Sequence, residues 1–220
     1  MRLPYLIILI ELLFLNVVLL GQEHTEWKPV KTCDNIKAYV QRVPGSELKR
    51  VKVETVFETS LGELVAIIKD AENHKNWVFF NESAEILEET NDCNWIYYGV
   101  TDTPWPVTSR DVVTQVSLSQ NKIDYSVIIT SIAIPNFLPE EEDYVRVEHI
   151  NAVWYLNPIG NGTVHINFEL EIDPGGNIPL WLVNLAVTKG PLKTVEGLIE
   201  EINSKKYETI KLDYIEEFVL

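Results

Sequence analysis

Hydrophobic and polar residues alternate along the middle of the chain. A period of two residues is typical of β-strands that bury one face. In residues 163–172, every second residue from Val164 to Ile172 is apolar, and the residues between them are polar. The alternation predicts strands over residues 51–58, 84–88, 95–101, 112–118, 123–134, 144–158 and 163–172.

Short polar segments separate several of these expected strands. Asn91-Asp92, Gln120-Asn121 and Gly160-Asn161-Gly162 are of the kind that joins two strands in a hairpin. Hairpins place neighbouring strands antiparallel, and the alternation gives the sheet one apolar face. We therefore expect an antiparallel sheet whose apolar face is covered by helices.

Two helical segments are expected after the strand over residues 51–58. Ser60 followed three residues later by Glu63 forms a capping box, which marks a helix N-terminus. Apolar residues then recur at helical spacing, which predicts an amphipathic helix over residues 61–72. A second, short helical turn is expected over residues 74–77.

The longest expected helix lies near the C-terminus, from about Asn177 and Pro179 to about Ser204, because asparagine can cap a helix and proline suits its first turn. Gly190-Pro191 interrupts this helix, since proline removes a backbone hydrogen bond and costs about 3 kcal/mol in a helix interior. The dipeptide is either a kink that acts as a hinge or a break between two ordinary helices. The pattern predicts a curved sheet that grips one long helix.

The N-terminus has a different composition from the rest of the chain. Arg2 precedes an almost unbroken apolar run over residues 3–20, which predicts a signal peptide over residues 1–21 and a periplasmic or secreted protein. The alternative is an uncleaved membrane anchor, because a run of this length just suffices to span a bilayer. One domain is expected over residues 22–204. The C-terminal extension, residues 205–220, either continues the helix or packs on another surface.

The composition is that of a globular protein, with 46% hydrophobic and 23% charged residues in a chain of 220. The 33 acidic residues outnumber the 18 basic ones, and the resulting net charge of −15 argues against nucleic acid as a partner. Residues 140–143 are consecutive acids in a loop. They form either an ordinary solvated loop or a local field that disfavours contact with anionic molecules and anionic membranes. We expect a monomer that contacts membranes only transiently.

Two motifs carry a resemblance to a known family. Residues 103–111 read Thr-Pro-Trp-Pro-Val-Thr-Ser-Arg-Asp, and residues 173–184 read Asp-Pro-Gly-Gly-Asn-Ile-Pro-Leu-Trp-Leu-Val-Asn. They resemble the Pro-Trp-Pro…Arg-Asp and Pro-Gly-Gly…Pro-Trp-Leu-Val-Asn segments of StAR-related lipid transfer (START) domains, in the helix-grip (SRPBCC) superfamily. Residues 36–39, 144–149 and 190–192 also fit in the right order. The resemblance extends from about residue 27 to residue 203.

This resemblance implies an α+β helix-grip fold, with a curved antiparallel β-sheet wrapped around a long C-terminal helix and short helices after the third strand. It also implies a hydrophobic tunnel between sheet and helix, which holds one lipid or other hydrophobic small molecule. Gly190 and Pro191 are the candidate gating hinge. The candidate ligand-binding residues are Trp105, Arg110, Arg146, His149, Trp181, Leu182 and Leu185. From the residues alone, the apolar side chains of the strands either line a cavity or fill a core.

Arg110 and Arg146 each allow two interpretations. A guanidinium at the end of an apolar tunnel can hold a hydroxyl, carboxylate or phosphate group, or it can pair with a nearby carboxylate and tie strands together. Arg110 and Asp111 are adjacent, so on a strand only one of them can face the tunnel. Residues 112–117 lack the further arginine that some sterol-carrying family members direct into the tunnel. Sterol specificity therefore does not follow from the resemblance.

The sequence gives little support for catalysis. It contains no Gly-x-Ser-x-Gly elbow, phosphate loop, dinucleotide fingerprint or His-Glu-x-x-His motif. Cys33 and Cys93 lack the spacing of a zinc site, and they form either one disulfide or two separate thiols. We expect a non-enzymatic, exported lipid-binding or lipid-transfer protein without a metal or cofactor. The alternative is a helix-grip enzyme of the polyketide cyclase or hydrolase type, with His149 near Arg146 and Glu148 in the same cavity.

Overall fold

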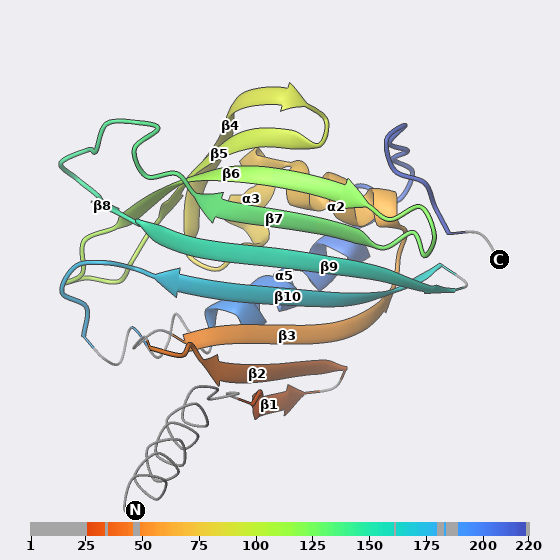
Figure 1. Cartoon of the computed structure of the whole chain (residues 1–220), viewed down its shortest axis with the longest axis horizontal. Coiled ribbons are helices and arrows are strands. Elements are labelled where there is room, and N and C mark those ends of the chain that lie inside the picture. Colours follow the sequence, from red (N-terminus) through yellow and green to blue (C-terminus); the bar gives the residue numbers. More distant parts are fainter. Residues whose placement is uncertain are drawn as a thin grey trace, which may run out of the picture.

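A computed structural model describes residues 26–33, 35–45, 49–160, 162–179, 183 and 189–218. In this part of the chain ten strands form one curved sheet, and the helices lie on one of its faces (Figure 1). The strand order is β1-β2-β3-β10-β9-β7-β6-β5-β4, with β8 beside β6. The strands are β1 Lys28–Cys33, β2 Ile36–Arg42, β3 Lys49–Glu58, β4 Asn81–Asn91, β5 Asn94–Thr101, β6 Arg110–Gln120, β7 Val127–Ala133, β8 Val145–Arg146, β9 His149–Gly160 and β10 Thr163–Asp173. The helices are α2 Leu61–Lys69, η1 Ala71–Asn73, α3 His74–Trp77 and α5 Gly190–Asn203.

The sheet is antiparallel apart from one short pairing. Among the described strands, only β6 and β8 pair in parallel. The pairs β4 and β5, β6 and β7, and β9 and β10 are neighbours in both sequence and space, as the three predicted hairpins require. The α+β helix-grip fold, with short helices after the third strand and a C-terminal helix against the sheet, is therefore confirmed.

The bounds of several strands differ from those expected. The run over residues 144–158 is two strands, because β7 covers only residues 114–120 of β6 and β8 pairs with the uncovered start of β6. The strand expected over residues 123–134 begins only at Val127, since a turn precedes it. Strands β1 and β2 have no clear alternation that would predict them, because β1 is the edge strand and its neighbour β2 buries only one residue.

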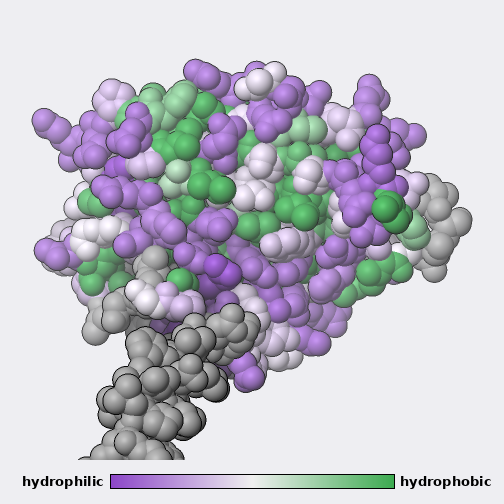
Figure 2. Space-filling view, in the orientation of Figure 1, coloured by the Kyte–Doolittle hydropathy of each residue, from purple (hydrophilic) through white to green (hydrophobic). Residues whose placement is uncertain are grey.

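The two faces of the sheet differ in character. On β7, Val127 and Ile129 are buried, whereas Ile128 and Ile132 point away from the helices and are exposed. The outer face is mainly hydrophilic, with hydrophobic residues scattered among hydrophilic ones (Figure 2). Where both faces of a strand carry apolar residues, as in β7, only those on the face toward the helices are buried in the core.

Helix α2 has two N-terminal caps. The Ser60 hydroxyl accepts a hydrogen bond from Glu63 N at 3.1 Å, as the capping box predicts. The Glu63 carboxylate does not complete the box, because it accepts a bond from the Thr59 hydroxyl at 2.7 Å. The carboxylate of Glu217 accepts bonds from the backbone N–H groups of Leu61 and Gly62. The helix ends at Lys69, earlier than residue 72, and η1 continues the turn.

The C-terminal extension packs on another surface and does not continue α5, which ends at Asn203. Tyr207 and Ile215 are buried in the core. Glu216 exchanges two backbone hydrogen bonds with the Gln120 side chain at the β6–β7 hairpin. Together with the Glu217 cap, these contacts make residues 205–218 part of the same packed unit as the sheet.

Helix α5 begins at Gly190, with Pro191 in its first turn. Proline is well accommodated there, because the first N–H groups of a helix have no intrahelical acceptor. The expectation of one continuous helix from about residue 177 is therefore corrected: Lys189 lies in a turn and α5 begins at Gly190, as a break at Gly190-Pro191 requires. Residues 180–182 and 184–188, which include Trp181, Leu182 and Leu185, lie outside the described residues.

Two further expectations concern features near the N-terminus. The expected signal peptide, residues 1–21, lies outside the described residues. None of the described helices is long and apolar enough to cross a membrane.

The sequence left open whether Cys33 and Cys93 form a disulfide or remain separate thiols. In the structure Cys93 carries a free thiol.

Helix α5 crosses α3 at a glycine. A Cβ atom added to Gly197 would overlap the carbonyl group of Trp77, which is backbone and cannot rotate away. A larger residue would therefore separate α5 from α3.

We expect Gly197→Ala to destabilise the protein by about 1–3 kcal/mol, because overpacking outweighs the better helix propensity of alanine. Urea unfolding would measure the loss. The comparison variant is Gly62→Ala in α2, where the added Cβ lies 3.1 Å from the Glu217 carboxylate that caps this helix; a side chain can shift more easily than backbone, so a smaller loss is expected. Equal or higher stability of Gly197→Ala would show that helix propensity dominates at this crossing.

Candidate functional site

Small residues occupy the middle of the concave face of the sheet. They are Gly99 on β5, Thr114 on β6, Ser131 on β7 and Ala152 on β9, and Ser131 is the register partner of Ala152. Because these side chains do not reach the helices, a cavity of about 290 Å³ remains between sheet and helices. This volume lies at the lower end of the roughly 300–1,000 Å³ that small-molecule sites usually occupy.

Large aromatic residues close one end of the cavity. Trp154 stacks on Phe168 with 4.1 Å between ring centroids, and Trp77 meets Trp154 edge-on at 6.3 Å. All three rings are buried and line the cavity. Toward the other end, β9 and β10 contribute Ile150 and Ile172. The lining is therefore mainly apolar along the whole length of the cavity.

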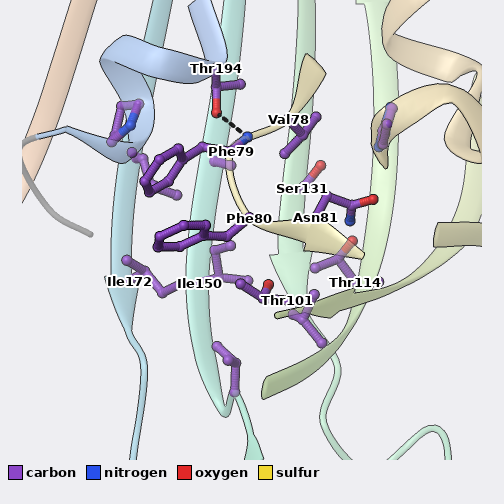
Figure 3. A pocket seen from close by; sticks show the side chains of 18 of the residues that line it. Val78, Phe79, Phe80, Asn81, Thr101, Thr114, Ser131, Ile150, Ile172 and Thr194 are labelled. Carbon is purple, nitrogen blue, oxygen red and sulfur yellow. Dashed lines mark hydrogen bonds between the residues drawn. The ribbon is translucent and has the colours of Figure 1, made fainter. Parts of the chain in front are cut away.

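The helical side of the cavity is built from α5 and from the segment that joins α3 to β4. Phe79 and Phe80 stack at 3.9 Å, and Figure 3 shows both rings on the same side of the cavity as Ile150 and Ile172. The backbone N–H of Phe79 donates to the Thr194 hydroxyl of α5 at 3.2 Å. Phe80 has a φ of 58°, which is unfavourable for a bulky residue. The segment is thus held in one conformation against α5.

His74 and Tyr97 form a buried polar pair in the cavity wall. His74 Nε2 lies 2.9 Å from the carbonyl oxygen of Ile68, so this nitrogen carries the hydrogen. Nδ1 therefore accepts the bond from the Tyr97 hydroxyl at 3.2 Å. Burial lowers the pKa of His74 to about 4, so the ring is neutral at pH 7. Gly99 makes room for Tyr97, because an added Cβ would lie 2.7 Å from its hydroxyl oxygen.

Arg110 lines the cavity and is a buried residue, with 5% of its surface exposed. It donates hydrogen bonds to the backbone carbonyl oxygens of Thr108, Pro174 and Gly175. These bonds tie β6 to the turn after β10. Burial lowers the pKa of Arg110 from its usual value, but the group stays protonated.

Arg146 fits the structural interpretation. Its Nε and Nη2 atoms bind the two carboxylate oxygens of Asp111 at 2.9 and 2.7 Å, and both side chains are almost fully buried. The hydrogen bonds that Arg146 donates to the Asp111 carboxylate raise the pKa of Arg146. Its remaining donors reach carbonyl oxygens of the β7–β8 connection, at Pro135, Leu138 and Pro139. Arg146 therefore fastens β8 and this connection to β6 and is not part of the cavity lining.

The other predicted site residues lie in different places. Trp105 stands 91% exposed on the β5–β6 connection, outside the cavity lining. The His149 side chain is 48% exposed, and its Nε2 lies 2.9 Å from Glu171, outside the lining as well. Gly190 and Pro191 both line the cavity. Of the nine predicted residues, the structure thus brings Arg110, Gly190 and Pro191 to one site, while Trp181, Leu182 and Leu185 lie outside the described residues.

Several lining residues carry signals that the sequence analysis did not use. Tyr97 and Thr114 are inward positions of alternating strands, next to the small residues that open the cavity. Phe79 and Phe80 are consecutive aromatic residues directly after a short helix. No metal-binding cluster of three or more His, Cys, Asp or Glu side chains occurs among the described residues.

We expect Asp111→Asn to destabilise the protein by about 3–5 kcal/mol, because it leaves the buried Arg146 guanidinium without its counter-charge. Thermal and urea unfolding would measure this loss. Asp92→Asn is the control, since the Asp92 carboxylate is 65% exposed where it pairs with Lys69 and should contribute less than about 1 kcal/mol. Similar losses for both variants would contradict the central role of the buried pair.

Comparison with known proteins agrees with this architecture. The START domain family model matches residues 11–206. An uncharacterised protein of Pseudomonas aeruginosa is 34% identical over 79% of this chain and 85% of its own length. The phosphatidylcholine transfer protein of Rattus norvegicus is 25% identical over 80% of this chain and 83% of its own length.

Solved structures show the same likeness. The crystal structure of a STAR-related lipid transfer protein fragment from Xanthomonas axonopodis superposes with a TM-score of 0.74 and 28% identity, covering 80% of this chain and 98% of that one. Human STARD10 shares the fold, with a TM-score of 0.70 and 19% identity over 88% of this chain and 80% of that one. The curved sheet, the C-terminal helix and the cavity between them thus occur in a chain that belongs to the START domain family.

Proposed function

We propose that this protein is an exported, non-catalytic lipid-binding or lipid-transfer protein that holds one hydrophobic ligand between the sheet and α5. The observation that carries the proposal is the apolar cavity, which is open where the inward residues of the central strands are small. Unfilled apolar space lowers stability, so its presence favours a bound molecule over a packed core. Relatives named as phosphatidylcholine transfer and STAR-related lipid transfer proteins support the same class of ligand.

The positions of the histidines support a non-catalytic role. His149 is the first residue of β9, and its exposed side chain does not line the cavity. A general base must reach its substrate, which His149 could not do there. His74 is in the cavity wall, but Ile68 and Tyr97 occupy both of its ring nitrogens. A cyclase or hydrolase that uses the same cavity would need to break one of these bonds during turnover.

Export and membrane contact belong to the same proposal. The apolar run over residues 3–20 supports passage across a membrane. The exposed indole of Trp105 is suited to a membrane surface, because tryptophan favours the boundary between apolar and polar layers. Thr103, on the same connection, lines the cavity. The acids over residues 140–143 favour uncharged over anionic surfaces.

Ligand binding should disappear when the cavity is filled. We expect solvent extraction and mass spectrometry of the purified full chain to yield one hydrophobic molecule per protein. Ala152→Phe should reduce its occupancy by about tenfold or more, because the new ring takes the space in the middle of the sheet. Val153→Phe, at the next position of β9 and pointing to the other face, is the control. The proposal fails if neither extraction nor incubation with a lipid panel gives a stoichiometric ligand.

The start of α5 is placed to control access. Gly190 packs against the Phe79 ring, with 3.4 Å between an added Cβ and its nearest ring carbon, and Pro191 lines the cavity. Pro191→Ala restores a backbone N–H and allows helix to continue through this point. We expect slower ligand exchange in stopped-flow measurements, while Pro29→Ala on the edge strand β1 should exchange normally. If Pro191→Ala exchanges its ligand at the same rate as the unchanged protein, Gly190-Pro191 does not act as a gating hinge.

A further inference from the structure

A row of hydroxyl groups crosses the otherwise apolar cavity wall. Tyr97 on β5 is the register partner of Thr114 on β6, and Ser131 on β7 lies diagonally next to Thr114. All three residues line the cavity. Figure 3 shows Thr114 and Ser131 beside Asn81 and Thr101, across the cavity from the rings of Phe79 and Phe80. The hydroxyl and amide groups are therefore gathered on one side of a mainly apolar cavity, opposite the rings of Phe79 and Phe80.

Several of these polar groups lack partners within the described part of the chain. Thr114 Oγ1 and Asn81 Oδ1 are buried and make no hydrogen bond, and the same holds for the indole nitrogen of Trp77. A buried polar group without a partner costs about 1–3 kcal/mol. The Tyr97 hydroxyl donates to His74, and its oxygen, which the Asn81 side chain also reaches, can accept a further hydrogen bond. An arrangement of this kind suits a ligand that supplies the missing hydrogen bonds.

The charged residues of the cavity wall are already satisfied. Asp111 is paired with Arg146, and the Arg110 guanidinium is directed at three backbone carbonyl oxygens. His74 is neutral, because its Nε2 hydrogen is bound to Ile68 and burial opposes a second proton. The described wall therefore offers a phosphate or carboxylate no cation without competing partners. Burying such an anion without a counter-charge would be costly.

We propose that the ligand is a neutral lipid with one hydroxyl or carbonyl group, which hydrogen-bonds to the Tyr97–Thr114–Ser131 row while its chain lies against the aromatic wall. This inference rests on the proposed function and narrows it, because it excludes phospholipids and fatty acids as the preferred cargo. It thereby separates this chain from its relatives named as phosphatidylcholine transfer proteins.

Three probes with the same saturated chain test the head-group preference: hexadecanol, palmitate and dipalmitoylphosphatidylcholine. Each is delivered from cyclodextrin to the delipidated full chain, and binding is followed by the fluorescence of Trp77, Trp95 and Trp154 in the cavity wall. We expect hexadecanol to bind at least about tenfold more tightly than either of the others, since they must bury a charge without a partner.

Variants of the row test where the hydroxyl binds. Thr114→Val and Ser131→Ala should each weaken hexadecanol binding by about fivefold, the effect of one lost hydrogen bond. Thr114→Val should leave the ligand-free protein as stable as before or more stable, because it removes an unpartnered hydroxyl. The control is Thr55→Val on β3, whose hydroxyl is also buried without a partner but lies outside the cavity lining.

The outcomes separate the two proposals. If palmitate or the phospholipid binds at least as tightly as hexadecanol, or if both row variants bind hexadecanol unchanged, the neutral-ligand inference is wrong and lipid binding stands. Preference for palmitate that is lost in Arg110→Gln would identify Arg110 as the anchor instead. If none of the probes binds and extraction yields no ligand, both proposals fail.

Discussion

The need to cover a strongly curved apolar surface governs this structure. The sheet presents a concave face that runs from β3 to β5, and α5 with the short helices covers it (Figure 1). Large residues at one end, among them Trp154 and Phe168, complete the packing with the helices. In the middle, the inward residues are too small to reach across, so covering the face leaves a cavity. The position of the cavity is therefore set by the small side chains in the middle of the sheet.

The elements around the cavity are held together by buried polar contacts. The Arg146–Asp111 pair fastens β8 and the following connection to β6, and Arg110 fastens β6 to the turn after β10. The Glu217 carboxylate caps α2 from the far end of the chain. These charges bind one another or the backbone, so the charged groups in the cavity wall already have partners.

Sequence patterns predicted the fold closely where burial is one-sided. The alternation in residues 163–172 corresponds to β10, and Ser60 caps α2 as expected. The patterns failed where a strand buries few side chains and where a long apolar run is divided between two strands. The edge strand β1 and its neighbour β2 bury too little to alternate, and the run over residues 144–158 is divided because β8 pairs with the free start of β6. The dipeptide Gly190-Pro191 was ambiguous, since proline suits both a helix start and a kink.

Local sequence determined the elements, the antiparallel order of the hairpins and, through two motifs, the family. It could not assign roles to single polar residues. Both Arg110 and Arg146 are candidate ligand anchors from the sequence. In the structure Arg110 lines the cavity, whereas Arg146 forms a buried ion pair with Asp111. Tyr97, Thr114 and Ser131 are far apart along the chain and meet only because β5, β6 and β7 are neighbours. Strand register and helix placement are non-local, so only the tertiary structure decided which side chains share the cavity.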